Sequence, residues 1–322
     1  MPIRIADLFC GIGGVAEAIS EGPRTTAKDH MTGRASAQQV NQMNASAVVM
    51  AIDIDQSVTS LYSQQHGVMP QCSTIESLEY VQLPDSADKI DMWWLSPPCQ
   101  PYTSRGLQRG CNDSRSNALA NLINLIPSER PRFVGFENVP AFRGSRHHQK
   151  LQQTLHETGY QTREYLICPT ELGVPMRRKR FYLLARRDKG KLDDFASTCP
   201  MRSLANFVDT PSWDNAALHV TAELLGRYRP AMNIIDLQDT SAVTACFTSA
   251  YGKSPIRSGS YLHCQRRGII RRFSANEIAS LMGFRKDFFS SCDLELRSQY
   301  RLIGNSLSVD VVSVLLSILL VV

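Results

Sequence analysis

The sequence lacks the cysteine patterns that mark disulfide-stapled domains and structural zinc sites. Its nine cysteines among 322 residues are odd in number and scattered, and no two of them have C-x-x-C spacing. This distribution disfavours a disulfide framework and a zinc site, so we expect no bound metal. It suits a reducing compartment, the cytoplasm or the nucleus.

Signals for membrane association are also missing. The N-terminus has neither the basic start nor the apolar stretch of a signal peptide. The C-terminal run 309–322 is strongly apolar, but at about 14 residues it is too short to span a bilayer. We therefore expect a buried helix there and no membrane association. The net charge of +5 is only a mild lean towards polyanionic partners.

The pattern of apolar segments predicts an α/β fold. With 43% apolar residues, the chain can bury a substantial core. The predicted strands are 4–9, 47–53, 90–95, 133–137 and 181–185, and the predicted helices are 15–20, 57–65, 116–126, 149–158, 274–283 and a segment after 305. Alternation of this kind is typical of a doubly wound, mostly parallel sheet with helices on both faces.

A smaller second lobe is expected after the main sheet. The alternation fades from 186 to about 240, and helical patterning returns at 274–283. We therefore predict a main domain of residues 1–185 plus 270–322, and a lobe with its connection at 186–269. A polar stretch at 23–44 is interpreted as a surface insertion.

Two strand ends carry nucleotide-binding features. Residues 10–14, Cys-Gly-Ile-Gly-Gly, join the first strand to the first helix, and such glycines let backbone approach a ligand at a helix N-terminus. Asp53 ends the second strand, where doubly wound folds bind a ribose hydroxyl. Each feature alone also fits a tight loop without ligand or a solvated carboxylate.

A cysteine between prolines follows the third predicted strand. Residues 96–102 are Ser-Pro-Pro-Cys-Gln-Pro-Tyr, so Cys99 sits on a stiff turn at the carboxyl end of a strand, where open sheets bind ligands. Free cysteines are more often small buried hydrophobes, but this position makes Cys99 a nucleophile candidate.

Five local motifs occur in a fixed order along the chain. They are Asp7-Leu8-Phe9 with Gly11, Gly13 and Gly14; Pro97-Pro98-Cys99-Gln100; Glu137-Asn138-Val139; Arg178-Lys179-Arg180; and Gly304-Asn305-Ser306. Together they closely resemble the cytosine-5 methyltransferase family, which uses S-adenosylmethionine. Cys246-Phe247-Thr248 with Ala250-Tyr251-Gly252, and the run 113–117, further resemble the type 2 branch, whose members methylate tRNA.

The resemblance implies an S-adenosylmethionine-dependent methyltransferase fold and a covalent mechanism. Cys99 would add to cytosine C6 and so activate C5, and Glu137 would act in its protonated form as a donor to N3, which requires a raised pKa. Arg178 and Arg180 would hold the cytosine O2 and the catalytic loop, the first as the substrate contact and the second as the structural one. The family's glutamine before these arginines is replaced here by Met176.

The resemblance also implies the cofactor residues. The adenosine and methionine moieties would lie near Phe9, Ile12, Gly13 and Gly14, the ribose near Asp53, the adenine near Ile54, Thr74 and Ile75, and the methionine end near Ser96, Asn305 and Ser306. Many relatives carry Trp where this chain has Ile54. The domain 1–185 plus 270–322 would then be catalytic, and the lobe would recognise the target.

The expected substrate is tRNA, with DNA as an alternative. The expected substrate-binding residues are Cys246, Phe247, Thr248, Tyr251 and Arg257, and the candidate phosphate contacts are Arg257, Arg266, Arg267, Arg271 and Arg272. A lobe of about 50 residues is small for reading the DNA major groove, whereas an RNA loop already splays its bases. We expect a monomer.

Two other function classes fit the sequence less well. A dehydrogenase would have the spaced G-x-G-x-x-G, but three residues on from Gly14 this chain has Glu17 instead of a third glycine. A non-catalytic nucleic-acid-binding module would explain the basic stretches 177–191 and 266–272, but it leaves Cys99 and Glu137 without a purpose. A catalytically weak relative that binds nucleic acid is a further alternative.

Overall fold

The computed structural model describes residues 2–21, 46–74, 89–102, 113, 116–195 and 199–320, so the predicted insertion 23–44 lies outside the described residues. The chain divides into two compact units. Unit 1 comprises Met1–Ile167, Lys179–Ser197 and Val311–Val322, and unit 2 comprises Cys168–Arg178 and Thr198–Asp310. Residues 270–310 thus group with the second unit. The predicted division into a catalytic domain and a target-recognition lobe is one of function, and it stays a prediction.

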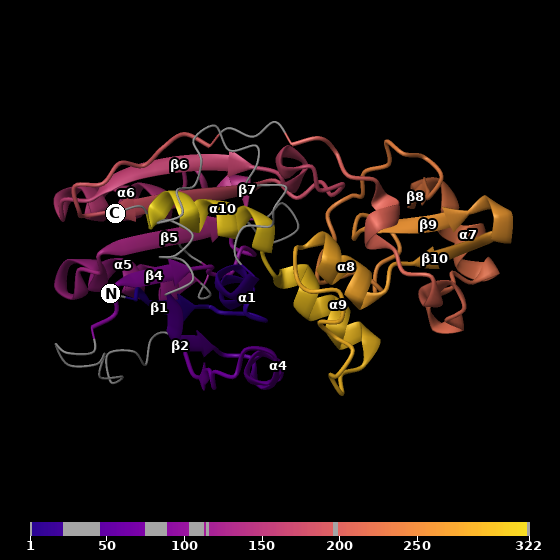
Figure 1. Ribbon diagram of the computed structural model, residues 1–322, viewed down its shortest axis with the longest axis horizontal. Coiled ribbons are helices and arrows are strands. Elements are labelled where there is room, and N and C mark those ends of the chain that lie inside the picture. The colour runs from indigo at the N-terminus through magenta and orange to yellow at the C-terminus, as the bar shows by residue number, and fades with distance from the viewer. Residues whose placement is uncertain are drawn as a thin grey trace. The chain divides into compact units, whose positions relative to one another are not determined.

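Unit 1 contains a seven-stranded sheet in the order β3-β2-β1-β4-β5-β7-β6 (Figure 1). Its strands are β1 Arg4–Leu8, β2 Ala47–Asp53, β3 Gln71–Cys72, β4 Met92–Leu95, β5 Phe133–Asn138, β6 Gln161–Ile167 and β7 Arg180–Arg186. The neighbouring strands from β3 to β5 pair in parallel, whereas β7 is antiparallel to both β5 and β6. The predicted mostly parallel α/β sheet is confirmed.

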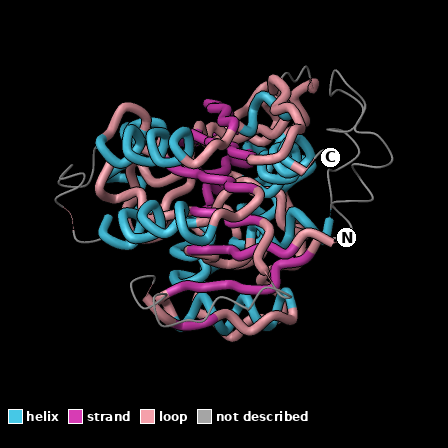
Figure 2. The backbone as a smooth tube through the Cα atoms, turned by 90° about the vertical axis from the view of Figure 1, so that its left-hand side faces the viewer, coloured by secondary structure: helices cyan, strands magenta, loops and turns pink. Residues whose placement is uncertain are grey.

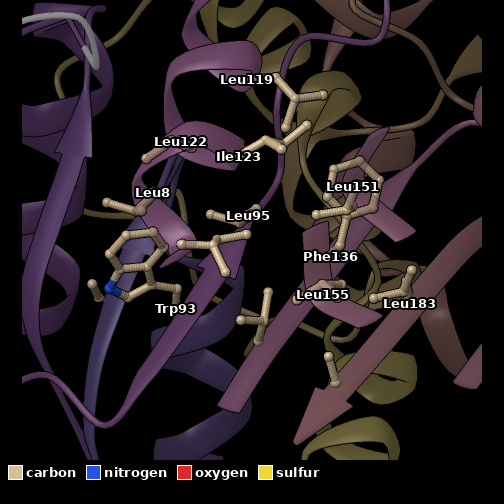
Figure 3. Packing of buried hydrophobic residues seen from close by; sticks show 14 of the residues in the cluster. Leu8, Trp93, Leu95, Leu119, Leu122, Ile123, Phe136, Leu151, Leu155 and Leu183 are labelled. Carbon is tan, nitrogen blue, oxygen red and sulfur yellow. The ribbon is translucent and has the colours of Figure 1, made fainter. Parts of the chain in front are cut away.

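Helices lie on both sides of this sheet (Figure 2). The long helices that contribute to unit 1 are α1 Gly14–Glu21, α4 Gln56–His66, α5 Asn117–Glu129, α6 Arg146–Glu157 and the last part of α10 Val309–Leu319. Apolar side chains of α5 and α6, among them Leu122 and Leu151, pack on Leu95, Phe136 and Leu183 of the strands (Figure 3). This core anchors β4 and β5, the strands whose carboxyl ends carry Cys99 and Glu137.

Unit 2 has a small sheet of its own. The sheet has the order β10-β9-β8, and its strands are β8 Asn233–Asp236, β9 Ser260–Cys264 and β10 Ile269–Arg272. The helices are α7 Ala222–Tyr228, α8 Ala275–Leu281 and α9 Leu296–Asn305. The sequence analysis predicted none of these strands, because they are short and none contains more than two consecutive apolar residues.

The last two helices, α9 and α10, place the motif 304–306 at the end of a helix instead of at the start of the final one. Residues 296–319 are, among the described residues, the one helical stretch long and apolar enough to cross a membrane, but 89% of its apolar window is buried within the fold, as in a core helix. Asn305 does not open the final helix, because α9 ends at Asn305 and α10 begins at Val309.

Candidate active site

The glycine-rich turn lies at the carboxyl ends of β1 and β2 in unit 1. Its backbone is left-handed at Phe9, Gly11 and Gly13, with φ of 63°, 51° and 85°. The Cys10 amide donates to the Ile52 carbonyl at 2.9 Å, and the Gly11 amide donates to Asp53 Oδ2 at 3.0 Å. The turn is therefore fixed against the end of β2, and α1 begins directly after it at Gly14.

A histidine that the sequence analysis missed supports this turn from α4. His66 Nε2 lies 3.2 Å from the Ile12 carbonyl oxygen. A Cβ atom at Gly13 would lie 2.3 Å from the same nitrogen, so only glycine fits between the turn and the ring. No local motif signals this contact, because His66 is remote from the turn in the sequence.

Asp53 and Ile54 form a polar and apolar pair at the end of β2. Asp53 accepts hydrogen bonds from the amides of Gly11 and Asp55, both at 3.0 Å, and burial is the largest cause that raises its pKa. The next side chain, Ile54, is 71% exposed. An acid beside an exposed apolar side chain matches the two needs of a nucleoside, a hydroxyl acceptor and a hydrophobic surface for the base. Thr74 is exposed just after β3, and Ile75 lies outside the described residues.

A buried carboxyl lies behind the turn, at Asp7 of β1. Asp7 is 1% exposed, and its Oδ2 has no hydrogen-bond partner among the described residues. Burial, and then the charge of Asp53, raise the pKa of Asp7 well above its ordinary value. The orphaned oxygen is a hydrogen-bond acceptor that a polar ligand of the turn can satisfy.

The turn that carries Cys99 follows β4. The Ser96 amide donates to the Leu8 carbonyl at 3.2 Å, and Trp94 Nε1 donates to Ser96 Oγ at 3.0 Å. Cys99 itself is half-buried. Asn138 Nδ2, at the end of β5, donates to the Pro97 carbonyl at 3.1 Å. This bond joins the Cys99 turn directly to the strand end that carries Glu137, a role of Asn138 that the motif did not reveal.

Glu137 forms an ion pair with Arg180. Glu137 Oε1 lies 3.3 Å from Arg180 Nε, and the two side chains are only 12% and 16% exposed. The pair exists because β7 runs antiparallel to β5 and begins at Arg180, so its first residue reaches the end of β5. The structure thus brings Cys99, Glu137 and Arg180 to one edge of the unit 1 sheet.

Arg178 is a buried tie within unit 2. It is 4% exposed, and its Nη1 donates to the Phe247 carbonyl at 2.9 Å and to Cys246 Sγ at 3.4 Å. Its Nη2 donates to the carbonyls of Gly304, at 3.2 Å, and Ser306. The planar guanidinium joins three segments of the unit. The contacts of the two arginines are therefore the reverse of those expected, because Arg178 joins segments of unit 2 and Arg180 pairs with Glu137.

The other predicted residues of unit 2 differ in their exposure to solvent. Phe247 and Tyr251 are each 1% exposed, and their rings pack edge-on with centroids 5.0 Å apart. Their side chains thus form the core of the unit rather than a substrate-facing surface. Cys246 and Thr248 are half-buried, Arg257 and Asn305 are exposed, and Ser306 is buried.

One candidate phosphate contact is excluded by its burial. Arg271 is fully buried, forms a bidentate pair with Glu277 at 2.7 and 2.8 Å, and stacks over the Trp213 ring at 4.2 Å. A guanidinium in this position supports the fold and cannot reach a nucleic acid. Arg266 and Arg267 are exposed, although Arg267 pairs with Asp214.

Known proteins match the chain over nearly its whole length. The family model described as C-5 cytosine-specific DNA methylase matches residues 3–319. The tRNA (cytosine(38)-C(5))-methyltransferase of Schizosaccharomyces pombe is 28% identical, covering 99% of this chain and 97% of that protein. A DNA (cytosine-5)-methyltransferase of Dictyostelium discoideum is 25% identical, with 98% and 94% covered.

A solved structure agrees with these sequence matches. The crystal structure of the S. pombe Dnmt2 methyltransferase has a TM-score of 0.79 and 26% identity, covering 99% of this chain and 98% of that one. The fold of this chain is thus that of the methyltransferases, and the resemblance found in the five motifs is confirmed. Because the family model spans nearly all of the sequence, the chain belongs to the C-5 cytosine-specific DNA methylase family, a family of cytosine-5 methyltransferases.

Proposed function

We propose that the chain transfers a methyl group from S-adenosylmethionine to cytosine C5 in tRNA, through a covalent adduct between Cys99 and C6. The observation that carries the chemistry is the Asn138 to Pro97 hydrogen bond, which holds the nucleophile turn against the strand end of Glu137. A nucleophile and a carboxyl brought together in this way match the two demands of the reaction, attack at C6 and charge relief at N3.

The chain's own residues would perform the steps as follows. The Cys99 thiolate forms a bond to C6, and Glu137 delivers its proton to N3, so that electron density reaches C5. C5 then takes the methyl group and loses its own proton to a base. The Cys99 sulfur leaves as the thiolate and the N3 proton returns to Glu137, which restores the neutral aromatic ring. The target base must first leave its stack to admit the sulfur.

Arg180 is the better candidate for the cytosine O2. It lies beside Glu137 and keeps 16% of its side chain exposed, whereas Arg178 is committed to the interior of unit 2. Arg180 would also hold the Glu137 carboxylate in place before the base enters. Glu137 would take up a proton as the base binds, and the ion pair would form again once that proton has moved to N3.

The cofactor would be held by the glycine-rich turn and the end of β2. Asp53 would accept from the ribose hydroxyls, Ile54 would cover the adenine, and the turn from Phe9 to Gly14 would approach the methionine moiety. The cofactor supplies an electrophilic methyl group. Ile75, Asn305 and Ser306 stay predictions for the same ligand.

The substrate class rests on the named relatives. The S. pombe relative is named for cytosine 38 of tRNA, and the strands of the unit 2 sheet are only four or five residues long. DNA is the second candidate, favoured by the Dictyostelium relative and by the family description. The location we propose is the cytoplasm or nucleus, and the active species a monomer.

The test is transfer of labelled methyl to total tRNA and to duplex DNA in parallel, with Cys99→Ala as the inactive control. We expect labelled tRNA only, and no label with the variant. Covalent trapping on RNA with 5-fluorocytosine, which cannot release its C5 substituent, should give a stable complex with the wild type alone. Labelled DNA with unmodified tRNA would reverse the substrate, and activity of Cys99→Ala would overturn the mechanism.

A further inference from the structure

The turn that carries Cys99 is fastened at both of its ends within unit 1. Asn138 holds the Pro97 carbonyl at its start. At its other end, Tyr102 Oη and His147 Nδ1 share a buried hydrogen bond of 2.7 Å. The Tyr102 amide also donates to the Cys99 carbonyl at 2.9 Å. The two fastened points therefore bracket the cysteine, three residues before Tyr102 in the chain.

The Tyr102 and His147 side chains are well shielded from solvent. Each residue is only 7% exposed, and burial lowers the pKa of His147, which keeps the ring neutral. A neutral imidazole and a hydroxyl can each donate or accept, so the bond forms with either ring tautomer. Removing one partner would leave a buried polar group of the other without its bond.

Aromatic contacts extend the fastening to β5. The Tyr102 ring packs edge-on against Phe142 with centroids 5.0 Å apart, and Phe142 packs against Phe136 at 4.5 Å. Phe136 directly precedes Glu137 in β5. The histidine on α6, the end of the Cys99 turn and the Glu137 strand thus form one packed group.

We propose that His147, acting through Tyr102, positions the Cys99 turn for attack on the base. This inference rests on the proposed role of Cys99 as the nucleophile. His147 is a positioning residue that does not touch the substrate. Without its bond to His147, Tyr102 would lose a buried anchor on α6 and the Cys99 turn could shift. A nucleophile displaced by about 1 Å loses roughly 10²-fold in rate, so a smaller shift would cost about tenfold.

The experiment compares four single variants of the full chain and the double variant Tyr102→Phe with His147→Leu. Tyr102→Phe removes only the hydroxyl, His147→Leu removes the partner, and His147→Asn replaces it with a side chain that can still donate or accept. Tyr165→Phe is the matched control, since Tyr165 is also 7% exposed and its hydroxyl donates a 2.7 Å bond, to the Asp193 carbonyl away from the turn. The measurements are single-turnover methyl transfer, KM for tRNA, and the rate of iodoacetamide alkylation at Cys99 by mass spectrometry.

We expect Tyr102→Phe and His147→Leu to lower the single-turnover rate by about tenfold with little change in KM, and to change the alkylation rate of Cys99. The double variant should be no slower than either single one, because both remove the same bond. His147→Asn should recover most of the rate, and Tyr165→Phe should match the wild type.

Two results would overturn the inference. One is a lowered melting temperature with unchanged turnover and alkylation, which would make the bond structural only. The other is strictly additive effects in the double variant. A wild type that methylates no nucleic acid would refute the proposed function instead, and the alkylation rates would still report whether the bond positions Cys99.

Discussion

Single side chains decide where Cys99, Glu137 and the glycine-rich turn lie in this methyltransferase. Asn138 fixes the Cys99 turn, Arg180 holds Glu137, and His66 lies beneath the glycine-rich turn. Short motifs in the sequence identified Cys99 and Glu137 as candidate site residues. The sequence did not predict their partners, since those come from other elements and depend on the register of the sheet.

Glu137 should be required for chemistry and not for cofactor binding. Glu137→Gln keeps the size of the side chain but has no acidic proton for N3, so we expect turnover to fall by roughly 10²-fold or more. Single-turnover rates and calorimetric titration with S-adenosylmethionine measure the two effects. Weaker cofactor binding with unaltered chemistry would place Glu137 in the cofactor site instead.

The buried carboxyl of Asp7 should make the cofactor-free protein less stable as the pH rises. Its pKa in the folded state is raised, so the folded protein binds more protons than the unfolded chain above the ordinary pKa of Asp. The contribution to stability is complete below that ordinary value and is lost as pH rises through the folded pKa.

Asp7→Asn removes this dependence. The melting temperature of the variant minus that of the wild type should increase from about pH 4 upward and then level off. Asp293→Asn, at an exposed position, is the control and should give a flat difference. A flat difference for Asp7→Asn as well would show that the carboxyl ionises freely in the fold.

At the scale of elements, the reversal of β7 creates the Glu137–Arg180 pair. If β7 ran parallel to β5, its last residue would lie beside the end of β5 in place of Arg180. The five predicted strands all exist, because each consists mostly of apolar residues in the buried part of the sheet. β6 was missed because it is an edge strand, and Gln161, Arg163 and Glu164 interrupt its apolar pattern.

The segment interactions of unit 2 were less predictable. Phe247 and Tyr251 looked like substrate contacts because their motif is typical of one branch of the family. A motif can equally preserve packing, and here Gly304 of α9 approaches this segment so closely that a Cβ atom would lie 2.3 Å from the Thr248 carbonyl carbon. The sequence contains no signal that separates these two reasons.

Arg178→Lys should destabilise unit 2. An ammonium group cannot reach the carbonyls of Phe247, Gly304 and Ser306 together, and losing buried hydrogen bonds to a charged group costs about 2–3 kcal/mol. Thermal unfolding measures the loss, and Arg177→Lys, at the exposed neighbour, should leave the melting temperature unchanged. An unchanged melting temperature with lost activity would return Arg178 to the role of substrate contact.

At the scale of the whole molecule, charge counts overstate the surface available to a polyanion. The net charge is +5, but Arg178, Arg186 and Arg271 are buried and bonded inside the fold. The exposed candidates are Arg257, Arg266 and Arg267, and Arg267 is paired with Asp214. No pattern in the sequence distinguishes these from the buried arginines, because the basic stretches contain both.

Binding of tRNA should therefore depend on salt through these exposed arginines. Arg257→Gln and Arg266→Gln should each weaken binding and reduce the slope of log K against log salt by about 1. Filter binding from low to physiological salt measures the slope. Lys150→Gln, which changes an exposed side chain of α6, is the control. Slopes that match the wild type would place the phosphate contacts elsewhere.

Unit 1 is built from separate segments of the chain, which affects how it folds during synthesis. Unit 1 includes the end of α10, where Val311, Leu315 and Leu316 are fully or almost fully buried, but the 113 residues of Thr198–Asp310 precede them in the chain. During translation, the glycine-rich turn and the Cys99 turn leave the ribosome long before α10, the helix that completes their unit. Apolar surface of the unit 1 sheet therefore stays exposed until α10 has been synthesised. We expect the nascent chain to bind chaperones, and the N-terminal half alone to fold poorly.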